Sequence, residues 1–305
     1  MIAGLVFRPA TAEDLVATYE VFVAAANDLR ARSGRPPIDD TPQRRGWAIP
    51  FRRHVLANDG AGFHVAEDDG RVVGFGIATV RERVWYLAAL HVLPAYQARG
   101  VGREVLRRCL AAAPPRSVRI VISESSQPVS NALYAKHGMY QWAPLLHVEG
   151  PIPARLDAPR LDQETLRADD EAMLETLDTI DRDVLGVART VDHRYWLAQP
   201  GVAGLLFRRG AEVSGYAYAS DAGKVGPVAV RSPRDVPPVL AASLASAAER
   251  GARVASLVVP GHCRSAVAYL LENGSRFGES INLLLASRPF GRMDRYLVSA
   301  LDALY

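Results

Sequence analysis

The sequence predicts an α/β protein, with mixed α+β sheets, made of two similar units that follow one another along the chain. Its 305 residues and 49% hydrophobic content are enough to bury a sizeable core, and this length favours two domains over one. Strand-like and helical segments alternate throughout, which indicates sheets covered by helices. The order of segments in the first half returns in the second half, so we interpret the chain as an internal repeat.

The first half is predicted to contain six strands and four helices. Asp69-Gly70 separates two strand-like runs, and this dipeptide is typical of a tight hairpin. Pro114-Pro115 ends one helix, and Gly138 is a typical C-terminal residue for the next. We predict strands at residues 5–8, 63–67, 72–80, 85–93, 118–123 and 145–148, and helices at residues 13–32, 43–57, 101–113 and 128–137.

The segment after residue 150 is rich in proline and interrupts the pattern. We therefore predict a first domain at residues 1–150, a linker at residues 151–161 and a second domain at residues 162–305. Gly274 follows a helix as Gly138 does, 136 residues earlier. In this half we predict helices at residues 163–185, 237–250, 265–273 and from residue 295, and strands at residues 202–207, 213–219, 225–230, 253–259 and 281–286.

The composition excludes several classes of function. The net charge of +3 is mild and the arginines are scattered, which argues against a nucleic-acid partner. No apolar run has the length of a membrane span and no leader is evident, so we expect a soluble cytoplasmic protein without a membrane partner. Cys109 and Cys263 lack metal-ligand or redox spacing, so we expect two buried free thiols and no metal site.

Residues 97–102 spell Q-x-x-G-x-G between a predicted strand and an amphipathic helix. Glycine lets the backbone turn sharply and approach a ligand closely. Successive N–H groups then point into one concavity, to which the helix N-terminus adds its positive end. Arg99 and Arg103 contribute further positive charge. This loop is suited to a pyrophosphate, and its spacing matches neither a Rossmann fingerprint nor a nucleotide P-loop.

Three segments together resemble the GNAT superfamily of acyl-CoA-dependent N-acetyltransferases. They are residues 90–94 (Leu-His-Val-Leu-Pro), residues 97–102 (Gln-Ala-Arg-Gly-Val-Gly) and residues 133–139 (Leu-Tyr-Ala-Lys-His-Gly-Met). The resemblance covers residues 1–150 in the order of elements and is motif-specific from about residue 85 to 140. It implies acetyl-CoA as the cofactor and direct transfer of the acetyl group to an amine.

The resemblance also implies which residues bind coenzyme A. The backbone of Leu90, His91 and Val92 would bind pantetheine, and the Val92 N–H would polarise the thioester carbonyl. Gln127 stands where the family usually has asparagine, and its amide can still bond pantetheine. The pyrophosphate would lie on Gln97, Ala98, Arg99, Gly100, Val101, Gly102 and Arg103.

Two residues are candidates for the proton transfers. The resemblance gives Tyr134 the role of general acid that protonates the departing thiolate, and a neutral phenol is suited to it. The alternative for Tyr134 is an aromatic residue of the core. Glu124 follows a predicted strand that leads toward the site, and it is either the general base or a solvated carboxylate. Glu82 and His91 are lesser candidates, and ordered water can also take the proton.

The second half lacks both motifs. Pro233, Pro237 and Pro238 remove N–H donors where a phosphate cradle needs them, and Leu270 stands at the position of Tyr134. The chain thus resembles tandem GNAT-like domains that form a pseudo-dimer, with the second domain degenerate. We expect an N-acetyltransferase for a small-molecule amine, active as a monomer or a homodimer. The alternatives are a protein or peptide N-terminal acetyltransferase and a non-catalytic acyl-CoA-binding pseudoenzyme.

Overall fold

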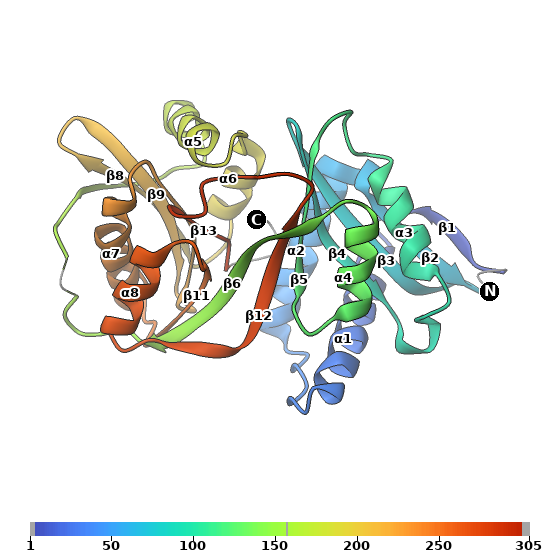
Figure 1. Ribbon diagram of the computed structural model, residues 1–305. Coiled ribbons are helices and arrows are strands. Elements are labelled where there is room, and N and C mark those ends of the chain that lie inside the picture. The colour runs from blue at the N-terminus through green and yellow to red at the C-terminus, as the bar shows by residue number, and fades with distance from the viewer. Residues whose placement is uncertain (1–3, 157, 301–305) are drawn as a thin grey trace. The chain divides into compact units, whose positions relative to one another are not determined.

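The computed structural model describes residues 4–156 and 158–300 and has the predicted mixed α/β architecture (Figure 1). The chain forms two compact units, Met1–Ile120 and Val121–Tyr305. One order of elements occurs twice along the chain: strand, two helices, three strands, helix, strand, helix, strand. The internal repeat predicted from the sequence is therefore present at the level of secondary structure.

The first unit contains an antiparallel four-stranded meander in the order β1-β2-β3-β4. Asp69 and Gly70 both have positive φ in the turn between β2 and β3, as the predicted tight hairpin requires. The chain leaves this unit within β5 (Val118–Glu124). The other elements are β1 (Val6–Pro9), α1 (Asp14–Arg32), α2 (Pro42–Asp59), β2 (Phe63–Asp68), β3 (Arg71–Arg81), β4 (Val84–Val92) and α3 (Val101–Leu110).

Helix α3 packs closely on one face of this meander. A Cβ atom on Gly76 would lie 2.7 Å from Val105 Cγ1 and 2.8 Å from Cys109 Sγ, so only glycine allows this approach. The indole N–H of Trp85 on β4 donates to the carbonyl oxygen of Cys109, at 3.0 Å. Helices α1 and α2 pack against β3 as well, and Phe75 on the opposite face of β3 from Gly76 contributes to that side of the core.

The second unit is built around β6 (Tyr140–Pro151), which pairs antiparallel with both β11 and β12 (Figure 1). The strand order here is β5-β12-β6-β11-β10-β9-β8-β7, and β10 and β11 are parallel. Its other elements are α4 (Pro128–Lys136), β7 (Asp162–Thr165), α5 (Glu171–Val184), α6 (Thr190–Leu197), β8 (Val202–Arg209), β9 (Glu212–Ser220), β10 (Lys224–Val230), α7 (Val236–Glu249), β11 (Val254–Pro260), α8 (Arg264–Glu272), β12 (Arg276–Ala286) and β13 (Tyr296–Leu297).

Two predicted elements differ from the structure. The helix predicted at residues 163–185 begins only at Glu171, because residues 162–165 pair with β8 as an edge strand. The helix predicted from residue 295 is wrong as far as residue 300, because Tyr296 and Leu297 form β13 and pair with β10. Helix α6 was not predicted. Within the described part of the chain, no helix is both long and apolar enough to cross a membrane.

A fully buried charged network joins α5, α6 and β9 in the second unit. The guanidinium of Arg189 donates to Asp181 at 2.7 Å and to the hydroxyl groups of Tyr216 and Tyr296 at 2.7 and 3.0 Å. His193 lies 3.1 Å from the Asp181 carboxylate through Nε2. Burial alone would raise the pKa of Asp181, but its interactions with Arg189 and His193 hold that pKa below the usual range.

We predict that Asp181→Ala strongly destabilises the protein, because it leaves the buried Arg189 without its carboxylate. The expected loss in the free energy of unfolding, measured in urea, is about 3–5 kcal/mol. The matched control is Asp183→Ala, since Asp183 is exposed on the same helix and its loss should change stability by less than about 0.5 kcal/mol. Equal losses in the two variants would show that the network does not stabilise the fold.

Candidate active site

The backbone of β4 presents two N–H groups away from the neighbouring strand β3. The N–H of Leu93 donates to the carbonyl of Val73 at 2.9 Å, and Gly74 lies opposite Val92 in the same register. Donors alternate between the two edges of a strand, so the N–H groups of Leu90 and Val92 point away from β3 and that of His91 points toward it. The side chains of Leu90 and Val92 lie on the α3 face, beside Gly76 and Gly74.

The loop after β4 is held to the end of that strand. The Gln97 side-chain amide donates to the carbonyl oxygen of Val92, at 3.0 Å. Ala98 and Gly100 both have positive φ, at 59° and 93°, and Gly100 is the N-cap of α3. A short 3₁₀ turn, Pro94–Tyr96, precedes them. These bends bring the N-terminus of α3 close to the end of β4, as the sequence motif predicts.

The first turn of α3 has the properties of an anion site. The first intrahelical bond runs from the N–H of Glu104 to the carbonyl of Gly100, so the N–H groups of Val101, Gly102 and Arg103 have no acceptor within the helix. No side chain caps this end of the helix. Arg99 and Arg103 are exposed, and neither pairs with a carboxylate among the described residues. These donors and charges fit a pyrophosphate.

His91 lies on the opposite face of β4 from Leu90 and Val92. Its ring packs against Phe22 at 5.1 Å, edge to face, and against Phe75 at 5.5 Å between ring centroids. Burial among these rings, together with the charge of Arg52, lowers the pKa of His91 to about 4. The imidazole is therefore neutral at physiological pH.

Tyr134 lies on α4, where only 5% of its surface is exposed. Gln127 is the N-cap of this helix: its N–H donates to the Glu124 carbonyl at 3.1 Å and its own carbonyl accepts the Asn131 N–H. Its side chain makes no capping hydrogen bond. Helices α4 and α8 have the same length and begin 136 residues apart, at Pro128 and Arg264, which makes Leu270 the counterpart of Tyr134.

Glu124 is the last residue of β5 and is partly buried. Because residues two apart in a strand share a face, it lies on the same face as Ile122. His147 on β6 is near enough for the Glu124 charge to affect it, although burial dominates and lowers the pKa of His147. Glu82, a lesser candidate for the base, lies in the turn before β4. Nine residues of extended strand span about 30 Å, so Glu82 is remote from the α3 N-terminus.

The corresponding place in the second unit is filled by the chain itself. Two of the first three residues of α7 are Pro237 and Pro238, which have no N–H to donate. The N-cap residue Asp235 is buried and pairs with Arg209 at 2.5 Å. Strand β13 pairs with the C-terminal half of β10, and the N–H of Val230 donates to the carbonyl of Arg295. A buried carboxylate and a paired strand thus stand where a pyrophosphate and a pantetheine arm would have to bind.

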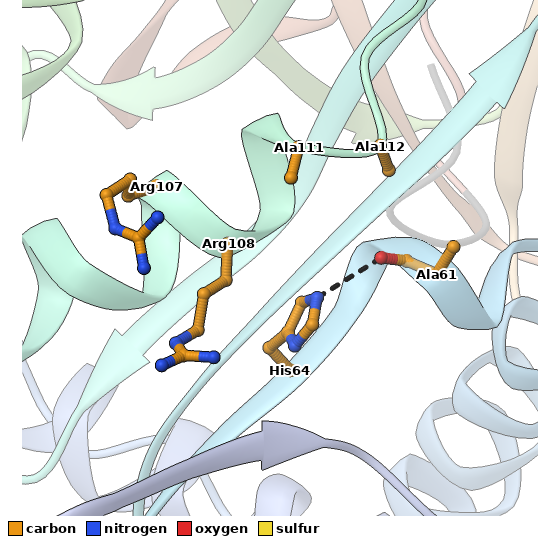
Figure 2. A pocket seen from close by; sticks show the side chains of 6 residues that line it. All are labelled: Ala61, His64, Arg107, Arg108, Ala111 and Ala112. Carbon is orange, nitrogen blue, oxygen red and sulfur yellow. Dashed lines mark hydrogen bonds between the residues drawn. The ribbon is translucent and has the colours of Figure 1, made fainter.

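A hollow that was not predicted lies at the other end of α3 (Figure 2). His64 there is 3.2 Å from the carbonyl of Ala61, and Arg107 and Arg108 both pair with Glu104. Helix α3 has 10 residues, so about 15 Å separates this hollow from the Gly100 loop. The residues that line it are Ala61, His64, Arg107, Arg108, Ala111 and Ala112.

Sequence reasoning also missed Arg52, which lies in α2 and is 5% exposed. Because α2 contains several arginines, nothing in the sequence around Arg52 distinguishes it as the buried one. Only its neighbours Pro50, Phe51 and Val55 indicate an apolar face. No group of three or more metal-ligating side chains suited to a metal ion occurs in the described part of the chain.

Comparison with known proteins finds a family model that matches part of the first half of the chain. Residues 24–139 match the model of the acetyltransferase (GNAT) family. A putative acetyltransferase from Pyrococcus horikoshii is similar in structure over 98% of this chain and 96% of its own, with 20% identity and a TM-score of 0.75. A GCN5-related N-acetyltransferase from Sphaerobacter thermophilus is similar over 94% and 97%, with 16% identity and a TM-score of 0.62.

A GCN5-related glucosamine N-acetyltransferase region of a fungal multi-domain GH3 β-N-acetylglucosaminidase is also similar, over 92% of this chain and 38% of that one, with 13% identity and a TM-score of 0.62. No curated protein matches the sequence. At these identities the solved structures establish a shared fold, and the match to the acetyltransferase family model covers residues 24–139.

We predict that His91 contributes to the pH dependence of stability. Its folded pKa lies below the value of about 6.5 in the unfolded chain, so unfolding takes up a proton between the two values. The contribution is complete above pH 6.5 and is lost as the pH falls toward 4. Urea unfolding at pH 7 and pH 5 should therefore show a smaller difference for His91→Gln than for the wild type. If His91→Gln and the wild type showed the same difference in stability between pH 7 and pH 5, folding would not lower the pKa of His91.

Proposed function

We propose that this chain, whose residues 24–139 form a domain of the acetyltransferase (GNAT) family, transfers an acetyl group from acetyl-CoA to a primary amine of a small molecule. The observation that carries the proposal is the uncapped N-terminus of α3, held by Gln97 beside the backbone N–H groups of Leu90 and Val92 that point away from β3. Bound acetyl-CoA supplies an acetyl group activated as a thioester.

The residues of the chain have separate roles in this proposal. The N–H groups of Val101, Gly102 and Arg103 bind the pyrophosphate, and the N–H of Val92 stabilises the negative charge that develops on the carbonyl oxygen. Tyr134 donates its hydroxyl proton to the sulfur as the C–S bond breaks. Glu124 accepts the proton that the amine nitrogen loses as the new C–N bond forms, directly or through water.

We predict one acetyl-CoA per chain in calorimetry, with binding lost in Gly102→Glu. A Cβ on Gly102 meets only Val92 Cγ2, at 3.7 Å, and an acidic residue in the first turn stabilises a helix. The variant should therefore fold normally while its carboxylate repels the pyrophosphate. Gly100 is a poorer choice because its φ of 93° strains any other residue.

The matched control for Gly102→Glu is Ser232→Glu, which places the same charge in the corresponding loop of the second half. This variant should bind as the wild type does. Two bound molecules per chain would contradict the proposal of a single cofactor site, and binding by Gly102→Glu equal to the wild type would remove the α3 N-terminus from that site.

We predict that Tyr134→Phe lowers turnover by about 10²–10⁴-fold while the dissociation constant for acetyl-CoA changes little, because only proton transfer is lost. The control is Tyr269→Phe, which removes a hydroxyl of similar burial from the corresponding helix α8. Equal turnover in Tyr134→Phe and the wild type would exclude the acid role. Turnover is measured as CoA release against amine, aminoglycoside, polyamine, amino-acid and peptide acceptors.

A further inference from the structure

Arg52 is a buried guanidinium in the first unit whose hydrogen bonds are incomplete. It lies over the rings of Tyr19, Phe22 and Phe75, with 5.6, 5.9 and 5.5 Å between Cζ and the ring centroids. Its Nη1 donates to the carbonyl of Ala48 one turn earlier in α2, at 3.0 Å. Its Nε is buried and has no hydrogen-bond partner among residues 4–156 and 158–300.

The charge of Arg52 has no carboxylate to balance it in the described part of the chain. Burial lowers its pKa to about 10, so the side chain still carries its charge at neutral pH. A buried cation without an anionic partner is costly, and aromatic faces compensate only part of that cost. Two other arginines are buried, Arg81 and Arg189, and both show the usual solution: Asp59 pairs with Arg81, and Asp181 accepts hydrogen bonds from Arg189.

The surroundings of Arg52 offer no spare acid. Helix α2 contains four arginines and one acidic residue, Asp59, which pairs with Arg81 at 2.9 Å. In the loop before α2, Asp40 already accepts hydrogen bonds from Arg45 and from the hydroxyl of Tyr19. The charged side chains around Arg52 therefore have an excess of positive charge. This excess disfavours a polycationic amine here and favours an anionic group.

Arg52 also lies close to the strand that would hold the acetyl group. Phe22 and Phe75 each contact both the Arg52 guanidinium and the His91 ring. The neighbours of His91 in the chain are Leu90 and Val92. A ligand whose anionic group reached Nε of Arg52 would thus extend, within a few bonds, toward the edge of β4.

We propose that Arg52 binds the carboxylate of the acceptor, which is an amino acid or another amine that carries a carboxylate a few bonds from its nitrogen. This inference rests on the proposed function and names the substrate class of the same site. The Nε–H and a terminal N–H of the guanidinium form a fork that matches the two oxygens of a carboxylate. The anion supplies the balancing charge that the chain lacks.

Entry to Arg52 requires one turn of α2 to move, because Nε is covered in this structure. Pro50 has no N–H to donate to the carbonyl of Gly46, so an intrahelical hydrogen bond is missing in the turn that Arg52 contacts through Ala48. This turn is therefore the part of α2 that yields most readily, and we assign it as the path of the carboxylate.

The test compares acceptors that differ only in the carboxylate. CoA release is measured with glycine, alanine, phenylalanine and glutamate, with the carboxamide of each, and with glucosamine as an amine without a carboxylate. The wild type should prefer at least one amino acid over its amide. In Arg52→Gln the kcat/KM for the preferred amino acid should fall by a factor of about 10–100, mainly because its KM rises. The kcat/KM for the amides should stay the same.

Two further variants separate binding from folding. Arg53→Gln removes the same charge from an exposed neighbouring position and should behave as the wild type. Arg52→Lys keeps the charge without the fork and should retain part of the preference. Thermal unfolding of Arg52→Gln should occur at or above the wild-type temperature, because the variant removes an unbalanced buried charge. A large loss of stability would instead identify Arg52 as a structural residue.

The outcomes distinguish this inference from the proposed function. Equal release with amino acids and amides, in the wild type and in Arg52→Gln alike, would overturn the carboxylate site while supporting acetyl transfer. No release with any acceptor would reject the proposed function. In that case the melting temperature is measured with and without the same amino acids, in the presence of coenzyme A. A rise in the wild type that Arg52→Gln does not show supports the carboxylate site. No rise in either protein overturns it.

Discussion

The close contact between helix α3 and strand β3 is the constraint on which the candidate site depends. Gly76 has no side chain, and any Cβ there would collide with Val105 and Cys109. The Trp85 indole fixes the far end of the helix by its hydrogen bond to Cys109. With the helix axis set in this way, the short loop after β4 has to deliver Gly100 in a left-handed conformation. The unsatisfied donors of the first helical turn then lie beside the end of β4, so a geometry suited to an anion follows from the packing of the apolar face of α3.

The same order of elements has had two different outcomes in this chain. In the first half the helix after three consecutive strands (α3, after β4) starts without a side-chain cap. In the second half that helix starts with prolines and a buried Asp235, and β13 pairs with the preceding strand. Each of these features replaces a contact that a cofactor would otherwise make. One copy with an uncapped helix N-terminus and one closed copy are therefore compatible with a single fold, because secondary structure depends on apolar periodicity while the groups offered to a ligand are a few backbone donors.

Arg52 and Arg189 show two ways in which the chain surrounds a buried charge. Arg189 has a carboxylate, two tyrosine hydroxyls and the indole ring of Trp196 around it, and all of these come from the chain. Arg52 has three aromatic rings and one backbone carbonyl. The first arrangement is complete and needs nothing more. The second is incomplete, and since Phe22 and Phe75 contact both Arg52 and His91, the missing anion points to a ligand rather than to the fold.

The sequence by itself determined the fold class, the repeat and the motif at residues 97–102, because these depend on local periodicity, glycine and proline. Gly138 and Gly274 mark corresponding helices 136 residues apart, and the structure has these helices at that spacing. The tertiary structure alone decided that residues 162–165 form a strand and that β6 pairs with β11 and β12, since sheet edges join residues distant in sequence. It also decided the surroundings of Arg52, because burial and the absence of a carboxylate depend on which side chains from α1, α2 and β3 meet in space.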